Sequence, residues 1–149
     1  MQPKRIRPLA LGIFRHAGRL LVFEGHDPIK GEAFYRPLGG GIEFGETGAQ
    51  ALAREIREEI GAEVTNVRYI GLCENIFTYA GEIGHEIVLL YEAELADRSL
   101  YERDVIEVVE PGGVTFKAFW PPLSDFADGR VPLYPDGLFA LLTKNAHVT

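Results

Sequence analysis

Apolar and aromatic residues gather in runs of strand length along most of this chain. The runs at 6–15 and 19–24 are separated by the tripeptide His-Ala-Gly, a break that predicts a β-hairpin. A second pair of runs, at 67–79 and 85–95, is joined by the sequence AGEIG. These runs predict another hairpin, because aliphatic and aromatic side chains favour strands.

Polar connections and shorter strand patterns fill much of the remaining sequence. Residues 26–33 predict a polar loop. The charged stretch 96–113 ends in Pro-Gly-Gly and predicts a mobile acidic loop with a short strand at 105–109. The sequence VTFKAFW, at 114–120, predicts one further strand.

One amphipathic helix is predicted in the middle of the chain, at 47–60. Leu52 and Ile56 belong to an apolar stripe with helical spacing, which can pack against a sheet. Thr47 suits the N-cap region of this helix, and Gly61 suits its end.

A closing helix is predicted within PDGLFALLT, where Pro135 suits the first turn. A chain that is mostly strands, with one helix in the middle and one at the end, predicts a mixed α/β domain built in layers. The chain has 149 residues, of which 46% are hydrophobic and 25% are charged. These values predict a single domain over residues 1–149 with a full core.

Charge and cysteine content restrict the classes of function. A net charge of −7 argues against broad binding to nucleic acids or anionic membranes, which would favour a basic face. The single cysteine, Cys73, excludes an intramolecular disulfide and a cysteine-based zinc cluster. No stretch approaches the roughly 18 apolar residues of a membrane span, and no signal sequence is evident. We therefore expect a cytoplasmic protein.

Three carboxylates share one face of the middle helix. Glu55, Glu58 and Glu59 fall within an arc of about 100°, because they are spaced i, i+3 and i, i+4. Their mutual repulsion suggests a site for divalent cations and for phosphates that the cations bridge. Gly48 and Ala51 precede them on this face, so we expect an open groove for a phosphate chain. An ordinary charged helix face is the alternative.

The wider context favours the metal site. Residues 40–62 fit a pattern of glycine, five residues, glutamate, seven residues, and then Arg-Glu-aliphatic-x-Glu-Glu-x-Gly-aliphatic, with a small Ala62 at the last position. The positions in register are Gly40, Glu46, Arg54, Glu55, Ile56, Glu58, Glu59 and Gly61. This segment resembles the signature box of the Nudix hydrolase family. The resemblance implies an α/β/α sandwich with a mixed central β-sheet.

The resemblance also implies a site for Mg²⁺ or Mn²⁺. Glu58 and Glu59 match the principal ligands, Glu55 matches a ligand or general base, and the Gly40 carbonyl matches a further ligand. These oxygens are the type that magnesium prefers. Bound metal would neutralise a pyrophosphate and lower the pKa of an attacking water.

Supporting and additional catalytic residues follow from the same resemblance. Glu46 and Arg54 match supporting residues paired across the loop. Helical spacing also lets Arg54 reach Glu58 one turn on and orient it. Members of the family often use a carboxylate outside the box as a base or extra ligand. Our candidate is Glu86, ahead of Glu82 and Glu107, because its strand is otherwise apolar and a buried carboxylate needs a partner.

Candidate substrate-binding residues flank the box and the second hairpin. Tyr35, Phe77 and Tyr79 can stack a nucleobase, and Arg36 can hold a phosphate or ribose. Core or sheet packing is the alternative for each aromatic residue. Tyr79 lies 17 residues after the box, near the place of a tyrosine that accompanies diadenosine polyphosphate hydrolysis in some relatives. Thr78 stands where some ADP-ribose pyrophosphatases have proline.

The sequence therefore predicts a metal-dependent pyrophosphohydrolase that cleaves a nucleoside diphosphate linked to another moiety. Dinucleoside polyphosphates, ADP-ribose and nucleoside triphosphates are the candidate small-molecule substrates. A Nudix-fold module that binds a nucleotide without cleaving it is the alternative, although it would be free to lose the three carboxylates. Isomerase chemistry on an isoprenoid diphosphate has little support from Cys73 alone. The oligomeric state is left open, with a homodimer among the options.

Overall fold

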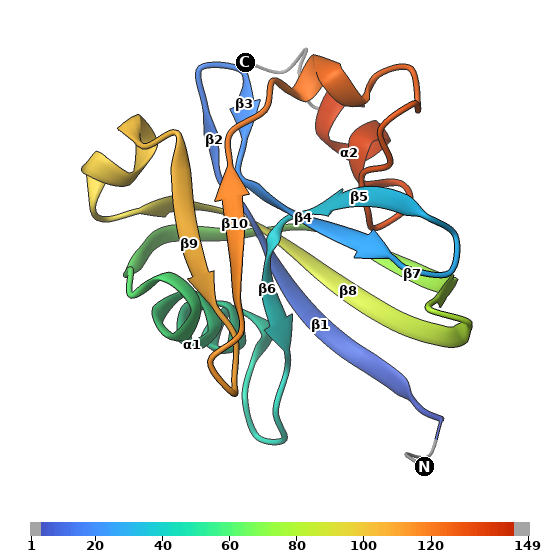
Figure 1. Ribbon diagram of the computed structural model, residues 1–149. Coiled ribbons are helices and arrows are strands. Elements are labelled where there is room, and N and C mark those ends of the chain that lie inside the picture. Colours follow the sequence, from blue (N-terminus) through green and yellow to red (C-terminus); the bar gives the residue numbers. More distant parts are fainter. Residues whose placement is uncertain (1–3, 145–149) are drawn as a thin grey trace.

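The computed structural model describes residues 4–144, and its strands form two four-stranded sheets beside a short two-stranded ribbon (Figure 1). The first sheet contains β6 (Leu38–Gly41), β1 (Ile6–Ile13), β8 (Glu82–Leu95) and β7 (Val64–Tyr79), in that order. The second sheet contains β5 (Glu32–Arg36), β4 (Val22–Asp27), β10 (Thr115–Phe119) and β9 (Val105–Val109). The remaining elements are β2 (Arg15–His16), β3 (Arg19–Leu20), the helices α1 (Gly48–Ile60) and α2 (Leu138–Lys144), and the 3₁₀ helices η1 (Arg98–Glu102) and η2 (Leu123–Phe126).

The two α-helices pack on opposite faces of the first sheet. Leu52 of α1 belongs to the same apolar cluster as Ala10 of β1, whereas Leu138 of α2 belongs to the cluster that contains Leu11. Successive residues of a strand point to opposite faces, so these two clusters lie on the two sides of β1. The sheet is mixed, because β1 runs parallel to β8 and antiparallel to β6. The predicted α/β/α sandwich with a mixed sheet is confirmed.

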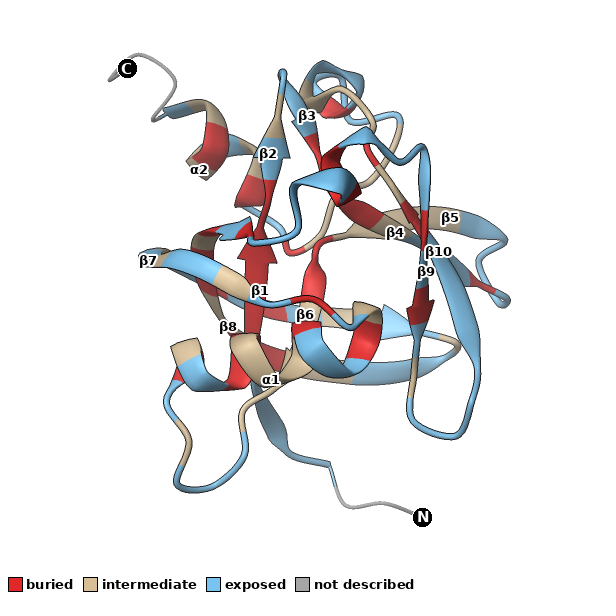
Figure 2. Ribbon diagram, turned by 90° about the vertical axis from the view of Figure 1, so that its left-hand side faces the viewer, coloured by how far each residue is buried: buried red, intermediate tan, exposed pale blue. Residues whose placement is uncertain are grey.

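The first predicted hairpin is wrong over most of its length. Only Arg15–His16 and Arg19–Leu20 pair around the turn at Ala17, and β1 and β4 then diverge into different sheets. The residues of β1 from Leu9 to Ile13 are buried throughout (Figure 2). Such a strand is stabilised by a neighbour on each edge, which β6 and β8 supply.

The second predicted hairpin is confirmed, since β7 and β8 pair antiparallel along nearly their whole length. The strand predicted at 105–109 is confirmed as β9, but the preceding acidic segment contains the helical turn η1. The predicted loop at 26–33 is mostly a hairpin, because β4 continues to Asp27 and β5 begins at Glu32. The closing helix begins at Leu138, three residues after Pro135.

Local signals at both ends fix the position of α1. The Thr47 Oγ1 accepts a hydrogen bond from the Gln50 backbone N–H at 3.1 Å, and the Gln50 side chain accepts one from the Thr47 N–H at 2.8 Å. This reciprocal capping satisfies N–H groups that the helix leaves free. Gly61 ends the helix with a positive φ of 67°, which costs least for glycine. The predicted N-cap and helix end are therefore confirmed.

Candidate active site

Gly40 allows the Glu55 carboxyl group to lie directly against the backbone of β6. A Cβ atom at this position would come within 2.5 Å of the Glu55 Cδ, a distance that real side chains do not tolerate. The first glycine of the box is therefore required by the close approach of strand and carboxylate. Any other residue here would displace Glu55 from its place beside the sheet.

Arg54 links the loop before α1 to the acidic face of the helix. Its Nε and Nη2 donate to the two oxygens of Glu46 at 2.8 and 2.9 Å, in a bidentate pair. Its Nη1 donates to Glu55 at 2.9 Å and to Glu58 at 3.3 Å, and its Nη2 also donates to the Gly41 carbonyl at 2.9 Å. The structure thus brings Glu46 and Arg54 together across the loop.

This pairing favours the charged form of both partners. Hydrogen bonds from Arg54 lower the pKa of Glu46 to about 2, with help from the Glu43 backbone N–H. The pKa of Arg54 is raised, mainly by the hydrogen bonds to Glu46 and further by those to Glu55. Both groups stay charged at neutral pH, so the pair holds the loop as a fixed ionic contact.

Glu59 has the opposite environment. Its side chain is only 3% exposed, and its Oε1 is buried without a hydrogen-bond partner among residues 4–144. Burial raises the pKa of Glu59 to about 9, and the charges of Glu110 and Glu55 add to the shift. A carboxylate in this position needs a compensating positive charge to ionise at neutral pH.

Glu110 is the acidic residue that sequence reasoning missed. It lies immediately after β9 and close enough to Glu59 to raise the pKa of that carboxyl. Along β9 the buried residues Ile106 and Val108 alternate with exposed ones, and Glu110 continues the inward series. Glu107 falls in the outward series and is exposed. This alternation was the available signal for preferring Glu110 to Glu107.

The other two carboxylates of the box lie at the edge of this cluster. Burial is the main cause of the raised pKa of Glu55, and hydrogen bonding from Arg54 opposes it. Glu58 is about half exposed and contacts Arg54. The expected open groove beside them is wrong. Ala51 is buried in the core, and a Cβ on Gly48 would meet the Tyr91 hydroxyl at 2.1 Å.

The donor set of this cluster fits a hard divalent cation. Within residues 4–144, no three His, Cys, Asp or Glu side chains already converge on one point as a finished metal site. The unpartnered Oε1 of Glu59 nevertheless lies close to the charges of Glu55 and Glu110. Magnesium needs only one or two carboxylates when waters and phosphate oxygens complete its shell.

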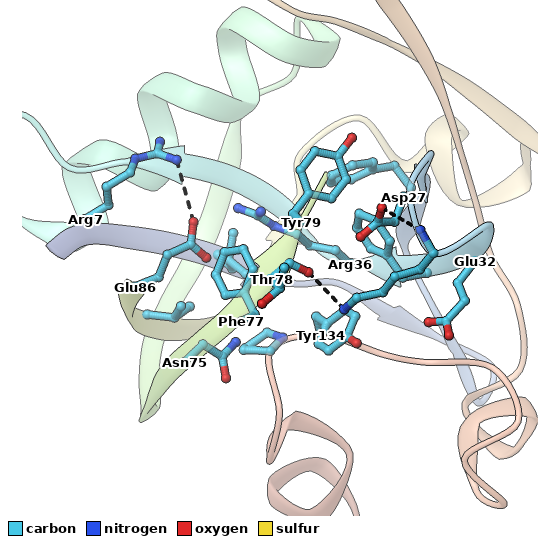
Figure 3. Close-up of a pocket in the computed structure, with 16 residues that line it drawn as sticks. Arg7, Asp27, Glu32, Arg36, Asn75, Phe77, Thr78, Tyr79, Glu86 and Tyr134 are labelled. Atoms are coloured by element: carbon cyan, nitrogen blue, oxygen red, sulfur yellow. Dashed lines mark hydrogen bonds and ion pairs between the residues drawn. The ribbon is translucent and has the colours of Figure 1, made fainter. Parts of the chain in front are cut away.

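A cavity of about 270 Å³ opens between β5 of the second sheet and the β7–β8 hairpin (Figure 3). Four of the predicted site residues line it, namely Arg36, Phe77, Tyr79 and Glu86. Arg36 interacts electrostatically with Glu86 and also with Glu59 and Glu110. It therefore connects the cavity to the carboxylate cluster. Burial lowers the pKa of Arg36, and its Nε has no hydrogen-bond partner in the described part of the chain.

Tyr35 is the predicted substrate residue that the structure does not bring to this cavity. Because side chains alternate along β5, Phe34 and Arg36 face the cavity, whereas Tyr35 faces the other side. Its ring packs edge-on against Phe119 at a centroid distance of 5.5 Å and also contacts Phe126. Tyr35 is therefore placed as a packing residue.

Glu86 lies in the cavity rather than beside the box carboxylates. It is 6% exposed, and its Oε2 is 3.6 Å from the Arg7 Nη1. The charges that raise the pKa of Glu59 are those of Glu110 and Glu55. The position of Glu86 thus argues against the base role that its strand pattern suggested, and Glu82 is exposed at the start of β8.

Comparisons with known proteins agree with this geometry. A family model described as the NUDIX domain matches residues 3–137. The chain belongs to the Nudix hydrolase family. A MutT NUDIX hydrolase from Burkholderia pseudomallei has the same fold, with a TM-score of 0.66 and 23% identity over 93% of this chain and 97% of that one. A NUDIX hydrolase from Nitrosomonas europaea gives a TM-score of 0.64 at 16% identity, over 97% of this chain and 90% of that one.

Curated relatives include NAD-capped RNA hydrolases and an RNA pyrophosphohydrolase. The NAD-capped RNA hydrolase NudC of Vibrio vulnificus is 31% identical over 76% of this chain, which spans 45% of that protein. The RNA pyrophosphohydrolase of Hydrogenovibrio crunogenus is 26% identical over 70% of each chain. The chain thus spans less than half the length of the NudC relative. Among the helices of residues 4–144, none is long and apolar enough to cross a membrane.

Proposed function

We propose that this protein is a metal-dependent pyrophosphohydrolase that cleaves a nucleoside diphosphate linked to another moiety. The observation that carries the proposal is Glu59, a buried carboxyl with an unpartnered oxygen beside two further acidic side chains. A bound cation would let this carboxyl ionise at neutral pH, which burial and the charges of Glu110 and Glu55 otherwise oppose. The adjoining cavity and Arg36 supply room and charge for the organic part and the phosphates of a nucleotide.

Glu59, Glu58 and Glu55 would hold Mg²⁺ or Mn²⁺, with the Gly40 carbonyl as a further ligand. The bound metal would neutralise the pyrophosphate and lower the pKa of an attacking water. Arg54 holds Glu55 and Glu58 in place through its Nη1. This charge-assisted contact keeps both carboxylates oriented before substrate arrives.

Proton transfer from the attacking water is assigned to Glu110, with Glu55 as the second candidate. Glu110 is partly exposed and adjoins the buried Glu59, so it can reach both solvent and the cluster. Arg36 would bind the substrate phosphate that lies between the carboxylate cluster and the cavity. Its guanidinium interacts with Glu59 and Glu110 in the cluster and with Glu86 in the cavity. Its unpartnered Nε is a donor available for a phosphate oxygen.

The names of the relatives favour substrates in which a pyrophosphate is joined to a nucleotide. These relatives are named as NAD-capped RNA hydrolases and as an RNA pyrophosphohydrolase. The net charge of −7 favours a free nucleotide derivative over a long RNA chain for this protein. A screen of nucleoside triphosphates, dinucleoside polyphosphates, ADP-ribose, nucleotide sugars and capped RNA with Mg²⁺ would identify the class.

Hydrolysis in ¹⁸O-labelled water tests the reaction itself. Attack on phosphorus places the label on a phosphate product, and the nucleotide keeps its base. Which phosphate carries the label identifies the attacked position. Label on a sugar carbon only, release of free base, or full turnover in excess chelator would contradict the proposal.

A further inference from the structure

One end of the cavity carries two polar side chains that the proposed chemistry does not use. Asn75 of β7 and Glu86 of β8 are direct cross-strand partners, both are buried, and both line the cavity (Figure 3). We propose that this pair reads the hydrogen-bonding edge of guanine, so that the protein selects guanine nucleotides. The inference rests on the proposed function only in taking the ligand to be a nucleotide.

Asn75 offers one hydrogen-bond donor to the cavity. Its Oδ1 accepts a hydrogen bond from the Asp136 backbone N–H at 3.2 Å, which assigns the orientation of the side-chain amide. No hydrogen bond within residues 4–144 engages its Nδ2. The amide nitrogen is therefore the group that a ligand would meet.

Glu86 offers two acceptors. Within the described residues its carboxylate accepts no hydrogen bond, and its ion-pair partner, the Arg7 Nη1, lies 3.6 Å away. That distance is too long for a hydrogen bond. Buried carboxylates normally have hydrogen-bond donors, and the cavity is the side from which donors can come.

One donor beside two acceptors matches the edge of guanine. The O6 atom of guanine accepts a hydrogen bond, and its N1–H and N2 amino group both donate. A carboxylate can accept both donors at once, while the Asn75 amide donates to O6. Adenine and cytosine each present a single donor group here, and hypoxanthine lacks the N2 amino group. These bases would leave one buried oxygen of Glu86 without a hydrogen bond. The cost of that unpaired oxygen should make them bind more weakly than guanine.

The cavity also supplies flat surfaces for a base. Phe34 and Phe77 each lie over a glycine of the neighbouring strand, because a Cβ on Gly25 or Gly84 would come within 2.4 Å of the ring. One face of each ring thus packs against the backbone, and the ring lines the cavity. Aromatic faces of this kind can stack against any nucleobase. A volume of about 270 Å³ suits one planar ring system rather than a second nucleotide.

Binding of mononucleotides in the presence of chelator tests the inference without any need for hydrolysis. Titration calorimetry should give GMP at least roughly tenfold tighter binding than IMP and AMP, since each comparison removes a hydrogen bond to a charged group. Glu86→Gln should weaken the binding of GMP by at least a similar factor. It should leave AMP unchanged or tighter, because a glutamine amide can accept from N6 and donate to N1 of adenine.

A matched control lies on the other face of the same strand pair. Glu74 is exposed and faces away from the cavity, so Glu74→Gln should keep the parent preference for GMP. Asn75→Asp retains the oxygen that accepts from Asp136 and removes the donor, so it should reduce the preference without Glu86 being changed. Melting curves establish that each variant is folded, and the comparison of GMP with IMP in the parent requires no variant.

Equal affinity of the parent for GMP, IMP and AMP would overturn the inference, as would absence of binding by all three. Retention of the full GMP preference in folded Glu86→Gln would also overturn it. A protein that prefers GMP but never hydrolyses a phosphoanhydride bond would refute the proposed function alone. A hydrolase with no base preference would refute the guanine inference alone.

Discussion

Glu46 and Glu59 belong to the same 23-residue box, yet the protein treats their carboxyl groups in opposite ways. Glu46 receives two hydrogen bonds from Arg54 and has a pKa near 2. Glu59 is buried beside Glu110 and Glu55, and its pKa is about 9. The first carboxylate is paired with an arginine of the chain, whereas the second has an oxygen with no hydrogen-bond partner among residues 4–144.

The difference shows that one motif combines a structural half and a functional half. The contacts of Arg54 join the loop to the helix and would stabilise the fold with or without a ligand. The environment of Glu59 costs stability until a cation binds, which is typical of sites arranged for function. Substitutions in the two halves should therefore affect different measurements.

Glu59→Gln should have the largest effect on function and a small effect on the isolated fold. We expect turnover to fall by at least roughly a hundredfold, because a neutral amide does not supply the charge that holds Mg²⁺. In chelator at pH 7 its melting temperature should equal or exceed that of the parent, because ionisation of Glu59 in the unfolded parent favours unfolding above pH 4.5 and a glutamine does not ionise. Added Mg²⁺ should raise the melting temperature of the parent only.

Glu63→Gln is the control for this experiment. Glu63 is exposed, follows the helix, and pairs with Arg57 away from the cluster. This variant should keep both turnover and stabilisation by Mg²⁺. A folded Glu59→Gln protein that Mg²⁺ stabilises as strongly as the parent would refute the assignment of Glu59 as a ligand.

Glu110→Gln should lower turnover by roughly tenfold to a thousandfold, an effect expected for loss of a general base. Glu107→Gln, three residues earlier and exposed on the outward side, should have no effect. Steady-state kinetics at saturating Mg²⁺ would separate the two. Comparable losses of turnover in both variants would show that negative charge on or beside β9 supports activity regardless of position, and would contradict the specific role of Glu110.

The sequence predicts the box helix well, because periodicity, the N-cap and the final glycine all depend on local interactions. It also predicts the β7–β8 hairpin, whose partners are adjacent in the chain. It fails for β1 and β4, since each pairs with strands distant in sequence. Prediction of those pairings would require knowing which strands are buried on both faces.

The candidate site divides in the same way. The carboxylates of the box follow from their spacing, and Arg36, Phe77 and Tyr79 do line the cavity. Glu110 was missed because it reaches Glu59 only through the packing of β9 near α1. Tyr35 was chosen by its position before the box, whereas the alternation along β5 turns its ring toward Phe119.

Arg54→Ala should chiefly reduce stability. It removes the hydrogen bonds to Glu46 and to the Gly41 carbonyl, and it leaves Glu55 and Glu58 without the arginine that contacts them. We expect the melting temperature to fall by roughly 5 °C or more in chelator. Arg57→Ala is the control, because Arg57 is exposed and its side chain pairs with Glu63, away from the loop. Equal melting temperatures of the two variants would show that Arg54 does not stabilise the loop.

The dependence of stability on pH should have opposite signs in the two halves of the box. The pKa of Glu46 is lowered from 4.5 to about 2, so its contribution is complete above pH 4.5 and is lost as the pH falls toward 2. The pKa of Glu59 is raised from 4.5 to about 9, so the native protein loses stability as the pH rises between these values. Melting temperatures measured in chelator should therefore show Glu46→Gln converging with the parent at acid pH. Glu59→Gln should instead gain on the parent toward pH 9. Parallel curves for the parent and both variants would mean that neither carboxyl has the environment described here.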